Sequence, residues 1–233
     1  MKRAEYIEKT LQIYSLVSLL SKKNGCEVLR LRNKETGKDL VLRSFPTPLA
    51  AYEELQNIRC IHLPEIYDVL ELDDGQIVLE EYIDGLTVAQ VMEIEKYRHS
   101  GAKAVLFGVC DALTVLHERG IIHRDVKPEN VMIEKSGRVV LIDLNASRTA
   151  SHESKDTVVM GTVGYAPPEQ LGISQTDART DIYAAGVLYN VMLTGQHPSV
   201  SIVSGKAGRI VRKCTAVNPD ERYQTAAALW AAL

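Results

Sequence analysis

One stretch constrains this chain more than any other: the run IHRDVKPEN at residues 122–130. It places an acid (Asp125), a cation (Lys127) and an amide (Asn130) within six positions, and a second acid, Asp143, follows the apolar run 139–142. An acid that orients a hydroxyl, a lysine that balances phosphate charge, and an amide and a carboxylate that hold Mg²⁺ are the groups that phosphoryl transfer requires. The fold must therefore bring these four side chains together.

The composition is that of an ordinary globular protein, with 45% hydrophobic residues, 24% charged residues and a net charge of −3. The sequence has no excess of basic residues that would indicate nucleic acid as a partner. It also has no polybasic run that would indicate binding to an anionic membrane. The apolar stretches are shorter than the roughly 18 residues of a spanning helix, and the N-terminus does not read as a signal peptide. The four cysteines are scattered without a C-x-x-C pair. We therefore expect reduced thiols in a cytoplasmic protein and no zinc site.

Strand signals dominate the first third of the chain and helical signals the rest. Residues 27–32, 40–42, 66–72 and 76–82 have strand patterns, the last two joined by a hairpin turn at 73–75. Residues 1–10 form a polar lead-in with helical tendency, and 50–61 has helical spacing. Further helices are predicted at 101–119, 181–193, 205–214 and 224–233. This segregation predicts an α+β fold in two parts, 1–84 and 85–233, that together make one domain.

Three later stretches reinforce the first one: GTVGYAPPE at 161–169, DIYAAG at 181–186 and NPDERY at 218–223. In order and spacing, these stretches and the run 122–130 resemble the conserved segments of the eukaryotic-type (Hanks-type) Ser/Thr protein kinases, in a short, bacterial-like form. The resemblance covers nearly the whole chain. It implies a bilobal kinase fold, with a smaller, mainly β lobe at 1–84 and a larger, mainly helical lobe at 85–233.

The resemblance also implies roles for particular residues. Asp125 would orient the substrate hydroxyl, Lys127 would neutralise charge on the transferred group, and Thr162 would belong to the catalytic set. Asn130 and Asp143 would hold Mg²⁺, or Mn²⁺ in its place, through oxygen. The implied ATP-binding residues are Val28, Val41, Arg43, Glu54, Glu81, Ile83 and Met132.

Other family positions imply structural roles. His123 is expected to be a packed structural histidine and not a base. Asp181 resembles the buried anchor of the catalytic loop, and Arg222 with Glu169 resembles a buried ion pair.

The first lobe departs from the family where it should hold ATP. The three glycine positions of the phosphate loop fall on Ser21, Lys23 and Cys26. Side chains there hinder a close approach of backbone N–H groups to phosphate. The simpler interpretation of the Asn24-Gly25 pair is a hairpin turn, and not part of a phosphate-binding loop. Lys22 or Lys23 is a candidate for a replacement phosphate ligand, against the simpler interpretation of exposed loop lysines.

The strand position of the family's phosphate-pairing lysine carries Arg43, which keeps the charge but not the shape. Its expected partner is Glu54 on a shortened helix, with Glu53 as the neighbour to exclude. Glu80 falls at the position whose side chain, in the family, controls access to the pocket behind adenine. A carboxylate at this position needs a partner of opposite charge or contact with water. In the second lobe, Asp143-Leu144-Asn145 stands where the family has the metal-binding triplet D-F-G. Asn145 replaces the glycine, and asparagine tolerates the positive φ of such a turn better than most other residues.

The loop at 146–157 is rich in serine and threonine. Autophosphorylation at Thr157 or Thr149, with Arg124 pairing the phosphate, is one hypothesis; a solvated polar loop is the other.

Three functions compete at this point. The first is a Ser/Thr protein kinase that uses ATP and Mg²⁺ on a protein substrate. The second is a pseudokinase, a nucleotide-binding or scaffold module for a partner protein. The third is a phosphotransferase that acts on a small molecule or adds another nucleotide-derived group. The sequence does not identify the substrate or the oligomeric state.

Overall fold

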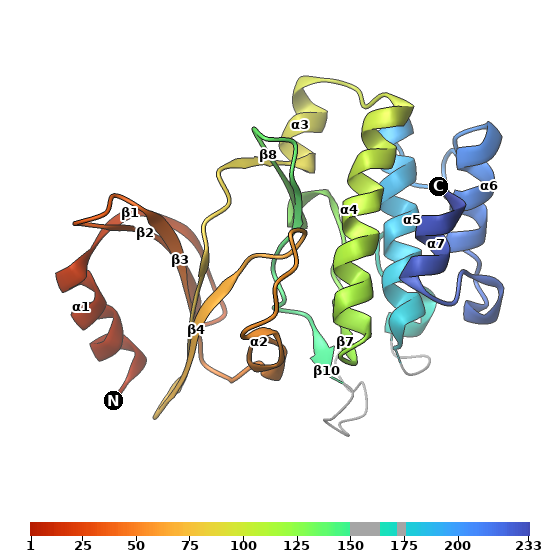
Figure 1. The fold of residues 1–233 in the computed structure, drawn as a ribbon. Helices are drawn as coiled ribbons and strands as arrows, with labels where there is room; N and C mark the ends of the chain where they lie inside the picture. Colours follow the sequence, from red (N-terminus) through yellow and green to blue (C-terminus); the bar gives the residue numbers. More distant parts are fainter. Residues whose placement is uncertain (150–163, 172–175) are drawn as a thin grey trace. The chain divides into compact units, whose positions relative to one another are not determined.

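The structure, a computed structural model, describes residues 1–149, 164–171 and 176–233. It divides into two compact units between Ile83 and Asp84, close to the division after residue 84 that the sequence indicates, and residues 61–63 belong to the second unit. The first unit is mainly strand and the second mainly helix (Figure 1). The predicted α+β class is therefore confirmed.

The first unit is built on a five-stranded sheet whose neighbouring strands are all antiparallel. The strands are β1 (Tyr14–Lys23), β2 (Cys26–Asn33), β3 (Asp39–Phe45), β4 (Ile66–Leu72) and β5 (Gly75–Glu81), in the order β1-β2-β3-β5-β4. Asn24 (φ 52°) and Gly25 (φ 77°) connect β1 to β2. Two positive φ values are typical of a two-residue hairpin turn, so the hairpin predicted at Asn24-Gly25 is confirmed.

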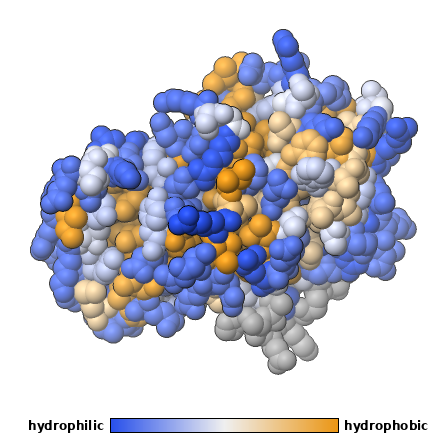
Figure 2. All heavy atoms as spheres, viewed as in Figure 1, coloured by the Kyte–Doolittle hydropathy of each residue, from blue (hydrophilic) through white to orange (hydrophobic). Residues whose placement is uncertain are grey.

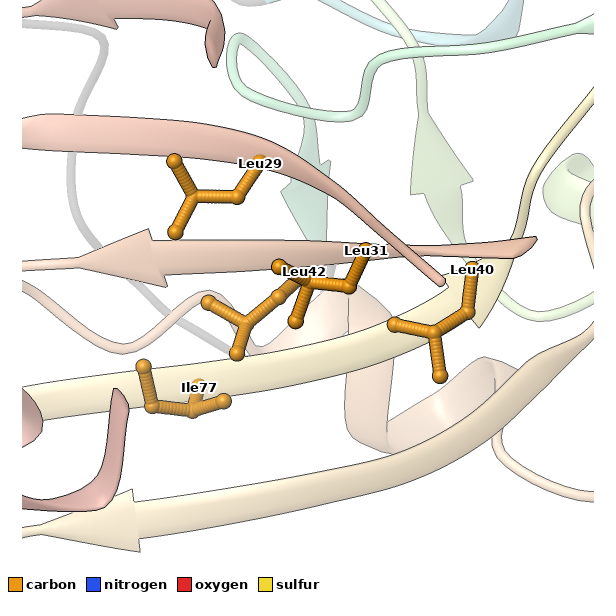
Figure 3. Packing of buried hydrophobic residues seen from close by; sticks show 5 residues of the cluster. All are labelled: Leu29, Leu31, Leu40, Leu42 and Ile77. Atoms are coloured by element: carbon orange, nitrogen blue, oxygen red, sulfur yellow. The ribbon is translucent and has the colours of Figure 1, made fainter. Parts of the chain in front are cut away.

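Side chains alternate between the two faces of a strand, and one face of this sheet carries an apolar cluster. Its members point toward one another in Figure 3 and are at most 7% exposed: Leu29, Leu31, Leu40, Leu42 and Ile77. Helix α1 (Arg3–Ile13) covers this face, with Tyr6, Ile7 and Leu11 packed on the cluster. The polar lead-in with helical tendency is thus a helix, and it closes the core.

The helix predicted over 50–61 is wrong in its length. Helix α2 spans only Ala50–Leu55, because Asn57 adopts φ 72°, a left-handed conformation that ends helices. Ile61, which the helical spacing places on an apolar face, is 71% exposed. The backbone then joins the second unit, where Leu141 N donates to His62 O at 2.9 Å.

The second unit is organised around two long helices, α4 (His99–His117) and α5 (Ala178–Thr194), which pack on each other. Helix α7 (Ala226–Ala232) packs mainly on α4, and α6 (Gly205–Cys214) packs on α5 (Figure 1). Among the described residues, α4 is the one helix that is long and apolar enough to cross a membrane by those two criteria. Leu106 and Leu113 of α4 are fully buried in this unit, so packing accounts for its apolar character.

Short elements complete the second unit and carry the catalytic stretch. The strands β6 (Gly85–Thr87), β8 (Val131–Glu134) and β9 (Val139–Leu141) form one sheet, and β7 (Ile121–Ile122) pairs with β10 (Arg148–Thr149). Helix α3 (Val88–Ile94) follows β6, and 3₁₀ turns lie at Pro128–Asn130, Pro168–Leu171 and Pro219–Glu221. The stretch 122–130 thus runs from β7 to the start of β8.

The face in Figure 2 is mainly hydrophilic, with scattered apolar residues. A concentration of large exposed apolar side chains lies at the end of α1 and along β1, the edge strand of the first sheet. These side chains are Ile13, Leu16, Val17, Leu19 and Leu20, each 41–58% exposed.

Candidate functional site: the catalytic loop and the Arg43 sheet face

The stretch 122–130, which the sequence predicts to be catalytic, is called the catalytic loop below. It is anchored by Asp181, which lies in the first turn of α5 and is fully buried. Its carboxylate accepts hydrogen bonds from His123 N (2.9 Å), Arg124 N (2.7 Å) and His117 Nε2 (2.8 Å). Burial alone would raise its pKa, but the hydrogen bond from His117 and the charges and N–H groups around it lower the pKa below its ordinary value. The predicted anchoring role of Asp181 is confirmed.

Two residues beside the predicted catalytic groups have strained backbones. Arg124 has φ 66° and Asp143 has φ 70°, both in the left-handed region that non-glycine residues rarely adopt. The Arg124 peptide is fixed from both ends, since Asp181 accepts from its N–H and Gln170 Nε2 donates to its carbonyl at 2.7 Å. Such strain persists where surrounding bonds hold it. No pattern in the sequence predicts this contact of Gln170.

Three of the predicted residues meet around one carboxylate. Asp125 Oδ2 lies 2.7 Å from Lys127 Nζ and accepts a hydrogen bond from Asn130 Nδ2 at 2.8 Å. Asn130 Nδ2 also donates to the Asp125 carbonyl at 2.9 Å. The carboxylate is therefore oriented by a cation and an amide, as a group that must accept or orient a hydroxyl proton requires.

The two predicted metal ligands lie at neighbouring strand ends. Asn130 precedes β8, Asp143 follows β9, and Ile142 N donates to Asn130 O at 2.9 Å. Because the Asn130 amide nitrogen is engaged by Asp125, its side-chain oxygen is the atom suited to a cation. An amide oxygen and a carboxylate fit Mg²⁺, which takes few protein ligands and completes its shell with water and phosphate. Within residues 1–149, 164–171 and 176–233, no group of three or more His, Cys, Asp or Glu side chains gathers as an alternative metal site.

His123 has the structural role expected of it. Its side chain is fully buried. Its Nε2 lies 3.2 Å from Ile142 O, and its Nδ1 accepts from Asp125 N at 3.3 Å. Both ring nitrogens thus serve the backbone of the loop.

The predicted ion pair between Arg222 and Glu169 is present and buried. Arg222 Nη2 donates to Glu169 Oε2 at 3.0 Å, and the side chains are 0% and 6% exposed. Arg222 also donates to three backbone carbonyls, those of Ala216, Val217 and Arg179. One guanidinium therefore ties the 3₁₀ turn Pro168–Leu171 to the backbone at residues 216 and 217 and to α5.

In the first unit, the strand register places a second group of predicted residues on one face. Val28 pairs with Arg43 across β2 and β3, and Val41 pairs with Glu80 across β3 and β5. Paired and alternate residues share a face, so these four residues lie on the face opposite the one that α1 covers. We call this the Arg43 face.

The partner of Arg43 differs from the prediction. Arg43 Nε lies 2.6 Å from Glu80 Oε1, and the two side chains are 7% and 4% exposed. Glu54, the expected partner, is exposed on α2, and the neighbouring Glu53 accepts from Gln76 Nε2 at 3.3 Å. The predicted Arg43–Glu54 pair is therefore wrong, because α2 turns Ala51, Tyr52 and Leu55 inward and its acids away.

The two candidate lysines of the hairpin lie on opposite faces. Lys22 forms an ion pair with Glu27, its register partner, and Glu27 pairs with Ser44 on the α1-covered face. Lys23 pairs with Cys26 on the Arg43 face. Of the two lysines, only Lys23 is on the face that carries Arg43.

The remaining predicted residues are placed as follows. Glu81 N donates to Glu65 O at 2.9 Å, and Ile83 is 4% exposed. Met132 lies on β8, opposite Val140 and Thr87. Thr162 lies outside the described residues.

Comparison with known proteins gives consistent results. The protein kinase domain family matches residues 28–230. The chain is 28% identical to the serine/threonine-protein kinase PknB of Mycolicibacterium smegmatis, over 94% of this chain and 42% of that protein. It is 31% identical to a probable PknB of Lactococcus lactis, over 72% of this chain and 27% of that protein. The chain is 26% identical to a probable serine/threonine-protein kinase of Streptomyces coelicolor, over 91% of this chain and 38% of that protein. The chain spans less than half the length of these relatives.

Proposed function

The chain belongs to the eukaryotic-type Ser/Thr protein kinase family, and on that premise we propose that it transfers the γ-phosphoryl group of ATP to a serine or threonine hydroxyl of a protein. The observation that carries the proposal is the arrangement of Lys127 and Asn130 around the Asp125 carboxylate. That arrangement supplies a proton acceptor, a balancing cation and a metal ligand within one loop.

In the proposed reaction, the substrate hydroxyl oxygen forms a bond to the γ-phosphorus, and the bond from that phosphorus to the β,γ-bridging oxygen breaks. ADP leaves with the bonding electrons, and the hydroxyl proton passes to Asp125. Lys127 neutralises charge on the moving group. Asn130 and Asp143 would hold Mg²⁺ or Mn²⁺, which would supply charge neutralisation at the phosphates.

The proposed nucleotide contacts belong to each unit separately. Val28 and Val41 offer an apolar face to adenine, and Met132 adds a second apolar contact from β8. The backbone of Glu81 and Ile83 would pair with the adenine edge, and Arg43 would contact the phosphates. Glu54 has no part in this account because it is exposed and does not hold Arg43.

The test is transfer from γ-labelled Mg-ATP to a mixed protein acceptor and to the chain itself. We expect the wild type to transfer phosphate. We expect Asp125→Asn to lose about 10²–10⁴-fold in rate, the usual contribution of a positioned acid or base. Asp143→Asn should lose transfer and shift the Mg²⁺ concentration required. Undiminished transfer in Asp125→Asn would refute the assignment.

A second candidate function is a nucleotide-binding module with little or no transfer. It is favoured by the first unit, where β1 and β2 pair up to Lys23 and Cys26 beside a plain two-residue turn. Side chains occupy the glycine positions of the family there. Calorimetry with Mg-ADP separates the two functions, since binding without transfer in the same preparation would favour the module.

Autophosphorylation of the polar loop is also testable. Thr149 is a poor acceptor, because it is 7% exposed and pairs with Ile121 in a strand. Thr157 lies outside the described residues and is the acceptor we propose. Mass spectrometry after incubation with Mg-ATP should find phosphate there and not on Thr149, and a loop without phosphate would count against the idea.

The proposed location is the cytoplasm. The four cysteines are widely scattered along the sequence without a C-x-x-C pair, a pattern that is usual for reduced thiols in a reducing compartment.

A further inference from the structure

Arg43 and Glu80 are held together inside the sheet of the first unit. They lie on adjacent strands, β3 and β5, with Nε and Oε1 2.6 Å apart. Both side chains are more than nine-tenths buried. A charge in such a position is retained when a partner of opposite charge stabilises it. The ion pair therefore helps to fix the orientation of both side chains.

The family ordinarily holds its strand cation in another way. In protein kinases, the β3 lysine pairs with a glutamate of the following helix, and movement of that helix makes or breaks the pair. Here the following helix, α2, has only six residues, and its Glu54 is exposed. The acid next to it, Glu53, is engaged by Gln76. Neither acid of α2 takes the ordinary place.

We propose that Glu80 has taken over this role and is the positioning residue that orients Arg43 toward the phosphates of the nucleotide. The inference rests on the proposed function in so far as that function supplies the nucleotide. Since both residues are carried by strands of one sheet, this pair orients the cation without an acid from α2. Nucleotide binding should then be insensitive to changes in the acids of that helix.

The chemistry of arginine fits the arrangement. A guanidinium carries five N–H donors in a planar fork, so a contact through Nε fixes the plane in which Nη1 and Nη2 donate. A lysine ammonium is a single point of charge, so a contact with one partner does not fix the direction of its remaining N–H donors in a plane. Glu80 and Arg43 therefore work as a pair in which the carboxylate sets the direction of the fork.

The test compares the binding of Mg-ADP with that of adenosine, which lacks phosphate, by calorimetry on the full chain. We expect Glu80→Met to weaken Mg-ADP binding about tenfold, the scale of one charge-assisted hydrogen bond. Adenosine binding should change by less than about twofold. Glu80→Gln keeps an acceptor for the Nε–H group and should recover most of the loss. The matched control, Glu54→Met, should bind both ligands as the wild type does.

Equal losses of Mg-ADP and adenosine binding in Glu80→Met would mean that Glu80 only supports the sheet, and would overturn the inference. A loss of Mg-ADP binding in Glu54→Met as large as in Glu80→Met would overturn it too. If Glu80→Met does not fold, Glu80→Gln against Glu54→Gln carries the test, with an expected loss of about threefold for Mg-ADP alone. A wild type that binds Mg-ADP but transfers no phosphate would refute the proposed function and still leave this comparison decisive.

Discussion

The catalytic loop and the Arg43 face differ in how their charged groups are held. In the loop, Asp125 has Lys127 and Asn130 as its neighbours, and a buried carboxylate, Asp181, fixes the backbone behind them. On the Arg43 face, the cation is an arginine, and its partner comes from a neighbouring strand and not from the helix. The loop carries the residues that the family resemblance predicts, whereas the sheet carries an arginine at the predicted cation position and supports it with an acid other than the predicted one.

This difference separates chemistry from binding. The loop contains the proposed proton acceptor, Asp125, and one of the two proposed metal ligands, Asn130, so we attribute the reaction to it. The sheet contains the side chains expected to hold the nucleotide, so substitutions there should alter affinity or stability first. The following predictions test that division, from the largest expected effect to the smallest.

The largest effect should come from Arg222, which supports the segment behind the loop. Arg222→Ala leaves the buried Glu169 carboxylate without its cation, and we expect a loss of about 3–5 kcal/mol in the free energy of unfolding. Urea unfolding measures it. The matched control is Arg212→Ala, an exposed position on α6, which should change stability by less than about 0.5 kcal/mol. An Arg222→Ala protein as stable as this control would contradict the role.

Asp181 should show the next largest effect. In Asp181→Asn, one carboxylate oxygen is replaced by an amide that faces N–H donors, and we expect a loss of about 2–3 kcal/mol. Phosphate transfer should fall as well, because the backbone of His123 and Arg124 loses its anchor. Asp84→Asn, at a site 71% exposed, serves as the control. Full transfer activity in Asp181→Asn would show that the strained loop holds its shape unaided.

On the sheet side, Leu11 tests whether α1 belongs to the core. Leu11 is partly buried against the apolar cluster, so Leu11→Ala should cost about 1 kcal/mol in the free energy of unfolding. Glu8→Ala, on an exposed position of the same helix, is the control. Equal melting temperatures for the two variants would mean that α1 contributes nothing.

Acid should weaken the sheet through Asp39. The hydrogen bond from Arg32, together with that from Arg30, lowers the pKa of Asp39 from its ordinary value of 3.8 to about 2. A carboxylate whose pKa is lower in the folded state stabilises the fold above its ordinary pKa, and this contribution is lost as the pH falls through the folded pKa. Melting temperatures between about pH 4 and pH 2 should therefore drop less steeply in Asp39→Asn than in the wild type. Parallel pH curves would exclude the effect.

The smallest effect should come from Lys22. Its pair with Glu27 is at the surface, where such pairs contribute about 0–1 kcal/mol, and it lies on the face away from Arg43. Lys22→Ala should keep the Mg-ADP affinity of the wild type. A loss in Lys22→Ala that is larger than the loss in Lys23→Ala would reverse the assignment of the two faces.

The comparison between the catalytic loop and the Arg43 face also explains which contacts could be predicted from the sequence. The contacts of Asp125 with Lys127 and Asn130 join residues a few positions apart, and the family stretches fix their order. The anchoring role of Asp181 and the Arg222–Glu169 pair could also be predicted, because these residues lie in stretches that resemble those of the family. The partner of Arg43 could not be predicted, because it depends on the register between β3 and β5 and on the side that α2 turns outward.

Two further differences have local causes. The helical spacing of Leu55, Ile58 and Ile61 suggested a longer helix, but the positive φ of Asn57 ends α2 early. The polar residues of the N-terminal segment concealed the positions Tyr6, Ile7 and Leu11 that pack on the sheet. A helix of weak amphipathic character is hard to recognise without the surface that it covers.

The most direct test of the account is one turnover of γ-labelled Mg-ATP, with wild type and Asp125→Asn compared at equal occupancy by nucleotide. The account predicts that the wild type transfers label to a serine or threonine hydroxyl and that Asp125→Asn does so at least about 10²-fold more slowly. A wild type that binds Mg-ATP and transfers no more label than Asp125→Asn would contradict it.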